Sequence, residues 1–172
     1  MIAHKQLAKV NPNIITCSSS GFGDTEINRP AYDNLIQGYG GAMSITGIDK
    51  ENPVKSGIPI ADLGAGLYAV IGILSALRSR DTHGVGEHVD ISMLDTQVSL
   101  LTYMATMHFL SGEDPEPIGN QHMNHVPFNS YQTKDGFIQI GVVAEDFWPN
   151  FVKALNLNAL DTDENKESKG RL

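Results

Sequence analysis

The chain has 172 residues, of which 41% are hydrophobic and 19% are charged, a balance typical of one globular domain or one domain and part of a second. Asp and Glu outnumber Lys and Arg by 20 to 12, and the formal net charge is −8. This charge argues against a general nucleic-acid binder, which requires a basic surface for phosphate. It leaves room for a small anionic ligand, because a few local positive groups or helix N-termini are enough to hold one.

Cysteine usage and hydropathy bear on the compartment. Cys17 is the single cysteine, so no intramolecular disulfide can form. The first residues lack the continuous apolar core of a signal peptide, and the apolar run at residues 67–77 is too short to span a bilayer. We therefore expect a cytoplasmic protein whose partners include neither a membrane nor nucleic acid.

The first half of the chain predicts an α/β arrangement. Residues 14–17 read as a buried strand that runs into a Ser/Gly loop, and a short helix begins near Asp33 and loosens through the glycines that follow. A longer helix is predicted over residues 62–80. Its apolar residues recur at spacings of three and four, the pattern of one helix face. They are Leu63, Leu67, Val70, Ile71, Leu74 and Leu77.

The second half predicts a smaller α+β piece. A strand at residues 88–91 and a helix at 93–110 complete the first part, and a Pro- and Gly-rich linker follows. The order then predicts a hairpin around residues 134–136 and a helix at 147–155. We expect a partial large α/β domain at 1–111, a linker at 112–126, a partial small α+β domain at 127–160 and a frayed polar tail at 161–172.

Asp62 is the first candidate for chemistry, and read alone it is a helix N-cap. Three small residues follow it: Gly64, Ala65 and Gly66. Glycine weakens a helix, but small side chains leave space for another group to approach the carboxylate. Both interpretations, the cap and the reactive carboxylate, fit this segment.

Other motifs are weaker. The segment "RPAYDN" puts Arg29, Tyr32 and Asp33 close together, which also suits an ordinary helix start. The "SSSGFGD" stretch lacks the third glycine of a dinucleotide-binding turn. His122 and His125 form a single spaced pair where zinc requires three or four converging ligands, so we expect no metal site.

Five collinear segments together resemble class III CoA-transferases of the formyl-CoA and carnitine CoA-transferase type. They are "NPNIITCSSSGFG", "RPAYDNLIQGYGGAMSITG", "PVKSGIPIADLGAGLYAVIGILSAL", "GVGEHVDISMLDTQ" and "GNQHMNHVPFNSYQTKDGFIQIGV". The resemblance implies a Rossmann-like large domain, a small α+β domain and an interlocked homodimer. Family members are more than twice as long, so we expect this chain to be a fragment, weakly active or inactive alone.

The resemblance also implies a mechanism. Asp62 matches the family's nucleophile, which forms an aspartyl anhydride and then an aspartyl-CoA thioester while CoA moves from an acyl-CoA to a small carboxylic acid. The coenzyme A thioester is the substrate, and no cofactor is tightly bound.

The resemblance assigns further site residues. Ala31, Tyr32 and Asp33 match a stretch that lines the CoA and acyl pocket. Arg29 is expected to meet either a CoA phosphate or a substrate carboxylate. Gly119, Asn120 and Gln121 fall where the family has a mobile glycine-rich loop that covers the aspartate.

Two alternatives stay open at this point. The same superfamily includes α-methylacyl-CoA racemases, which pair the aspartate with a histidine where this chain has Tyr32. A tyrosine, with a usual pKa near 10, is a poor base at neutral pH, so the substitution favours the transferase. The other alternative is an inactive fragment that binds a partner chain through uncovered helices.

Overall fold

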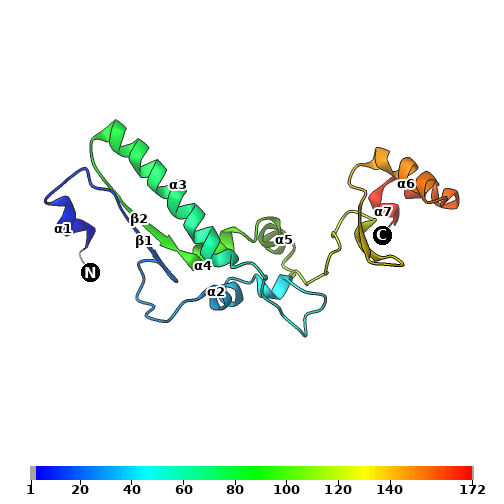
Figure 1. Ribbon diagram of the computed structural model, residues 1–172, viewed down its shortest axis with the longest axis horizontal. Helices are drawn as coiled ribbons and strands as arrows, with labels where there is room; N and C mark the ends of the chain where they lie inside the picture. Colours follow the sequence, from blue (N-terminus) through cyan, green and yellow to red (C-terminus); the bar gives the residue numbers. More distant parts are fainter. Residues whose placement is uncertain (1–2, 172) are drawn as a thin grey trace. The chain divides into compact units, whose positions relative to one another are not determined.

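The computed structural model describes residues 3–171, and the chain forms two compact units, Met1–Pro117 and Ile118–Leu172 (Figure 1). The elements of the first unit are α1 (His4–Ala8), β1 (Thr16–Ser20), α2 (Asp33–Tyr39), the 3-10 turn η1 (Met43–Ile45), α3 (Ile60–His83), β2 (His88–Ser92), α4 (Met93–Ser99) and α5 (Tyr103–Ser111). Those of the second are β3 (Phe128–Gln132), β4 (Phe137–Gly141), η2 (Glu145–Phe147), α6 (Trp148–Ala154), η3 (Asn158–Leu160), η4 (Glu164–Lys166) and α7 (Ser168–Arg171).

A two-stranded parallel sheet forms the centre of the first unit. Strand β1 pairs with β2 in a register that puts Thr16 opposite His88 and Ser20 opposite Ser92. The strand expected at residues 14–17 therefore begins later and continues through the serines that were assigned to a loop. The strand at residues 88–91 is confirmed.

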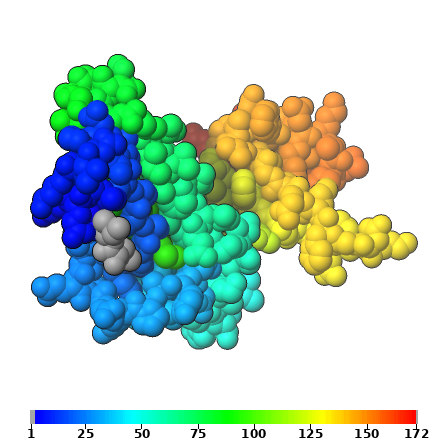
Figure 2. Space-filling view, turned by 60° about the vertical axis from the view of Figure 1, so that its left-hand side comes forward, coloured from blue at the N-terminus to red at the C-terminus, as the bar shows by residue number. Residues whose placement is uncertain are grey.

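Hydrogen bonds explain why a serine-rich segment forms a strand. Ser18 Oγ donates to Asp90 Oδ1 at 2.7 Å and lies 3.1 Å from His88 Nε2, and Thr16 Oγ1 lies 2.7 Å from His88 Nδ1 and 2.9 Å from His4 Nδ1. Through His4, the N-terminal segment, blue in Figure 2, thus contacts the face of the sheet that carries Thr16 and Ser18. Side-chain polar contacts take the place of the apolar burial that strand prediction relies on.

Helix α3 covers the opposite face of this sheet (Figure 1). It was expected at 62–80 and is longer, with 24 residues. It ends at Gly84, whose φ of 74° allows its N–H to reach the Arg80 carbonyl at 2.7 Å.

The buried face of α3 is the small-residue face. Ala61, Gly64, Ala65 and Ala76 are buried. The large apolar residues expected to form a core stripe are exposed in this chain, at 54% for Leu63 and 67% for Leu67, because α4 and the sheet pack against the small side chains. Five members of that stripe are exposed: Leu63, Leu67, Val70, Ile71 and Leu74. The apolar run at residues 67–77 was expected to be too short to span a bilayer, but α3 as a whole is long and apolar enough to do so. Core helices of soluble proteins pass the same test.

The prediction of one continuous helix over residues 93–110 is wrong, because the chain forms α4 and α5 with a turn between them. Thr102, with a φ of 51°, breaks the helix. Leu100 is the C-cap residue of α4. Its side chain packs against Gly64 of α3, where a Cβ atom would lie 2.8 Å from Leu100 Cδ1. At the other end Ser92 Oγ accepts the Asp95 N–H at 3.1 Å and caps α4.

The second unit contains the expected antiparallel hairpin, β3–β4, and the expected helix, α6. Val142, Trp148 and Val152 form its core. The polar tail is not frayed over the described residues, because Arg171 folds back onto α6. Its guanidinium carbon lies 4.5 Å from the centre of the Trp148 ring, and the side chain is only 3% exposed.

Candidate functional site

Asp62 is the third residue of α3 and lies in its first turn. Its side chain is exposed and has no hydrogen-bond partner among residues 3–171. The N-cap position belongs to Pro59, which supplies no side-chain cap. The interpretation of Asp62 as an N-cap is therefore wrong, and its carboxylate accepts no hydrogen bond from residues 3–171.

The cap of α3 comes instead from helix α2. Asp33 Oδ1 accepts a hydrogen bond from the backbone N–H of Ala61 at 3.0 Å. Asp33 Oδ2 accepts another from Gln37 Nε2 at 2.7 Å. A carboxylate at this position satisfies an orphan donor of the helix and complements its dipole.

Two other backbone donors at the start of α3 have backbone acceptors. Ile60 N donates to Ile58 O at 2.8 Å, and Leu63 N donates to Pro59 O at 3.0 Å. With the Ala61 N–H held by Asp33, the N–H of Asp62 is left without an acceptor among the described residues. An exposed carboxylate and a backbone N–H that has no acceptor within residues 3–171 thus belong to the same residue at a helix N-terminus.

The three small residues after Asp62 have different surroundings. Gly64 and Ala65 are buried, and Gly64 lies against α4. These two residues therefore allow close helix packing and do not open a path for another group to reach Asp62. Gly66 is exposed, and a Cβ atom built there meets no atom of the described residues within 4 Å. Residues four apart lie on the same helix face, so Gly66 leaves open the surface beside Asp62.

The "RPAY" segment lies in the first unit, before α2. Arg29 is exposed and lines a cavity of about 670 Å³ together with Phe22, Glu26, Tyr39 and Leu94 among others. Tyr32 occupies the N-cap position of α2 and is 67% exposed, and Ala31 is half-buried against Gly21. Within residues 3–171, Asp33 alone of the predicted residues forms a hydrogen bond with the helix that carries Asp62.

Gly119, Asn120 and Gln121 belong to the second unit. Gly119 has a φ of 63°, and Gln121 N donates to Ile118 O at 3.2 Å, which defines a tight turn. Asn120 Nδ2 donates to Ser130 Oγ at 2.8 Å and ties this turn to β3.

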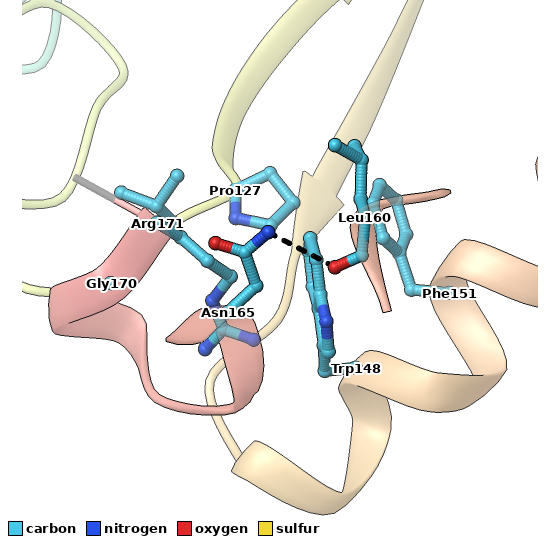
Figure 3. A pocket seen from close by; sticks show the side chains of 8 residues that line it. Pro127, Trp148, Phe151, Leu160, Asn165, Gly170 and Arg171 are labelled. Atoms are coloured by element: carbon cyan, nitrogen blue, oxygen red, sulfur yellow. Dashed lines mark hydrogen bonds between the residues drawn. The ribbon is translucent and has the colours of Figure 1, made fainter. Parts of the chain in front are cut away.

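The second unit also has a pocket of about 330 Å³ that sequence analysis did not predict (Figure 3). Trp148, Phe151 and Leu160 form much of its wall, and Asn165 Nδ2 donates to the Leu160 carbonyl at 3.0 Å. Arg171 joins it from the C-terminal segment, so the pocket marks where this segment packs on α6.

Glu145 fixes the same C-terminal segment. The Ser168 backbone N–H and the Arg171 guanidinium, at 3.1 and 2.6 Å, stabilise its charged form and lower the pKa of Glu145.

Gln37 is the residue of the site that sequence analysis missed. It is 1% exposed, and its Oε1 accepts the Ser56 N–H at 2.8 Å. The available signal was its spacing of four residues from Asp33 on a predicted helix, where Gln and Asp side chains meet.

Comparison with known proteins identifies the family. The sequence model of CoA-transferase family III matches residues 1–171, so the chain belongs to this family. A solved structure of a CAIB/BAIF family protein from Brucella suis matches 99% of the chain with a TM-score of 0.83 and 32% identity, and the chain covers 46% of it. The α/β class predicted from the sequence is confirmed at this level.

The curated relatives are CoA-transferases by name. The chain is 34% identical to succinate–glutarate CoA-transferase of Agrobacterium fabrum, over 94% of this chain and 41% of that protein. It is 38% identical to acetyl-CoA:oxalate CoA-transferase of Acetobacter aceti, over 77% of this chain and 35% of that protein. The chain therefore spans about two fifths of the length of these relatives.

Proposed function

We propose that this chain carries the nucleophile of a CoA-transferase and that Asp62 is that nucleophile. The observation that carries the proposal is the exposed Asp62 carboxylate at the N-terminal turn of α3 in a family III chain, with no hydrogen-bond partner within residues 3–171. A carboxylate suits this reaction because the anhydride that it forms keeps the activation of the thioester it replaces.

The reaction proceeds through two kinds of covalent intermediate on Asp62, a mixed anhydride and a thioester. The carboxylate attacks the thioester carbonyl and expels CoA thiolate, which leaves a mixed anhydride. The thiolate then attacks the Asp62 carbonyl carbon and expels the donor acid, which leaves an aspartyl-CoA thioester. The acceptor carboxylate reverses both steps, so that CoA leaves on the acceptor and Asp62 is regenerated without net proton transfer.

Backbone and side chains near Asp62 support these steps. Its own N–H, which lacks an acceptor among residues 3–171, is available to the oxyanion that forms during attack. The open surface at Gly66 admits the thioester, and Arg29 offers a cation for a phosphate or carboxylate. Relatives named for succinate, glutarate and oxalate support short dicarboxylic acids as the acid substrates.

The assembly belongs to the same proposal. We propose a cytoplasmic homodimer in which the exposed apolar stripe of α3 packs against protein rather than lipid. The stripe consists of Leu63, Leu67, Val70, Ile71 and Leu74. Soluble monomers rarely expose large contiguous apolar patches, so an exposed apolar stripe supports an interface with another protein chain. Light scattering on the purified chain, with and without detergent, measures the oligomeric state.

The nucleophile is tested by trapping its thioester. The chain is incubated with succinyl-CoA, and mass spectrometry of its peptides is expected to find CoA on Asp62. Asp62→Asn should carry no CoA and keep its helical circular dichroism, because Asp62 does not cap α3. Asp95→Asn, an exposed carboxylate on α4, is the matched control and should still be labelled. Equal labelling of Asp62→Asn would refute the assignment.

A further inference from the structure

Gln37 connects three segments around the start of α3. Its Nε2 donates to Asp33 Oδ2 at 2.7 Å, and its Oε1 accepts the Ser56 N–H at 2.8 Å. Asp33 Oδ1 in turn accepts the Ala61 N–H at 3.0 Å. One buried amide therefore ties α2 to the loop before α3 and, through Asp33, to the first turn of α3.

We propose that Gln37 and Asp33 are positioning residues that hold the first turn of α3 and so aim Asp62 at the thioester. We call this pair the Gln37–Asp33 clamp. The proposal rests on the proposed role of Asp62 and changes the role of Asp33, which the family resemblance placed among the pocket-lining residues. Both Asp33 oxygens already accept hydrogen bonds within the chain, so this carboxylate acts through the helix.

The orientation of the Gln37 amide is determined by its partners. A flipped amide would turn its oxygen toward the Asp33 carboxylate and its NH₂ toward the Ser56 N–H, so it would lose both hydrogen bonds. With Gln37 only 1% exposed, water cannot replace them. The amide consequently fixes the direction of the Asp33 carboxylate.

The capped donor is the one next to the nucleophile. Ala61 is buried and directly precedes Asp62, so the clamp fixes the backbone from which the Asp62 side chain projects. Pro59 occupies the N-cap position of α3 and supplies no side-chain cap, so Asp33 is the capping side chain among the described residues. The clamp also takes the Ala61 N–H and leaves the Asp62 N–H for the reaction. Small displacements of a reacting group lower rates strongly, which gives this restraint a catalytic consequence.

Amide hydrogen exchange tests the clamp without any reaction. In Gln37→Met, which keeps the volume but not the hydrogen bonds, protection of the Ala61 amide should fall at least tenfold. Protection of the Ala76 amide, far along the same helix, should stay unchanged. Gln97→Met is the matched control, a buried glutamine on α4 whose Oε1 has no partner among the described residues, and it should leave Ala61 protected.

Gln37→Glu provides a conservative rescue. A protonated carboxyl group has one donor and one acceptor and reproduces the amide's bonds to Asp33 and Ser56, whereas the ionised form repels Asp33. Protection of Ala61 in this variant, measured against the original chain at the same pH, should be lost at pH 7 and recover as the pH is lowered toward 5. A variant that merely disturbs packing would not recover.

The catalytic consequence is read from single-turnover labelling of Asp62 by succinyl-CoA. Gln37→Met should slow labelling at saturation about tenfold and change the half-saturating concentration less than twofold, because positioning acts on the attack rather than on binding. A raised half-saturating concentration with an unchanged rate would return Asp33 to substrate binding and overturn the clamp. Unchanged Ala61 protection would overturn it too. Absence of labelling in the original chain would instead refute the proposed function for this chain and favour the inactive-fragment alternative.

Discussion

Gly72 of α3 lies directly against Val89 of β2, and a Cβ atom built on Gly72 would be 2.6 Å from Val89 Cγ1. The absence of a side chain therefore sets how closely the helix that carries Asp62 approaches the sheet. Val89 is β-branched and has little freedom to turn away. Because α3 makes its packing contacts through small residues, this approach holds the first unit together.

Gly72→Ala should consequently lower the stability of the first unit. Overpacking against Val89 costs about 1–3 kcal/mol, which offsets and exceeds the gain of about 1 kcal/mol in helix propensity. Thermal unfolding followed by far-ultraviolet circular dichroism measures the change. Gly66→Ala is the matched control, since its Cβ would meet nothing within 4 Å in the part of the chain that the structure describes, and it should raise the melting temperature. Equal effects of the two substitutions would contradict the close contact.

Gly66 allows a second, functional prediction. A leucine at this position would project over the preceding helical turn and cover Asp62. Gly66→Leu should therefore reduce labelling of Asp62 by succinyl-CoA at least tenfold while the chain stays folded. Gly66→Ala should retain most of the labelling because a methyl group covers little of this surface. Full labelling of the leucine variant would show that the thioester approaches from another side.

Periodicity predicted most helices and strands of this fold, and it failed where polar contacts or small residues decided the packing. Strand β1 was misplaced because Ser18 is held by His88 and Asp90, which are far away in the sequence. The exposed stripe of α3 was mistaken for a core face because large apolar residues are normally the buried ones. In this helix Gly64 and Gly72 make the contacts, and glycine leaves no apolar signal in the sequence.

The candidate site, too, was only partly predictable from the sequence. The position of Asp62 near the start of a helix was predictable from the local pattern, but its cap was not, because the capping carboxylate comes from Asp33 on another helix. Gln37 was not predicted as a site residue. Its role depends on hydrogen bonds to Asp33 and Ser56, and the bond to Ser56 forms only when α2 packs against the loop before α3. Hydrogen bonds between residues far apart in the sequence can be identified only once the fold is known.

The third prediction concerns pH and the second unit. The Ser168 N–H and Arg171 lower the pKa of Glu145 below its ordinary value of 4.5. A group with a lowered pKa stabilises the folded form above the unfolded-state pKa, and that contribution is lost as the pH falls through the folded-state pKa. Acidification from pH 5 downward should therefore loosen the C-terminal segment from α6.

Urea unfolding at pH 7 and near pH 3, followed by the fluorescence of the single tryptophan, Trp148, measures this effect. Glu145→Gln should lower the midpoint at pH 7 and show a smaller further loss at low pH than the original chain. Asp146→Asn, its exposed neighbour, is the control and should keep the original pH dependence. A Glu145→Gln profile parallel to the original would remove Glu145 as the cause.

The fourth prediction addresses Arg29. Its exposed side chain lines the cavity of about 670 Å³ in the first unit, where a guanidinium can pair with a phosphate or a carboxylate. Arg29→Gln should raise the half-saturating concentration of succinyl-CoA in Asp62 labelling about fivefold at low salt. The effect should shrink at high ionic strength, because exposed charges are screened. Arg78→Gln, an exposed cation toward the far end of α3, should behave like the original chain.

Comparing two thioesters separates the two partners of Arg29. Acetyl-CoA has the CoA phosphates but lacks the free carboxylate of succinyl-CoA. If Arg29 binds a phosphate, Arg29→Gln should weaken labelling by both compounds to the same extent. If it binds the substrate carboxylate, only succinyl-CoA should be affected. Unchanged labelling by both compounds would exclude Arg29 from the site and leave its cavity without a role in CoA transfer.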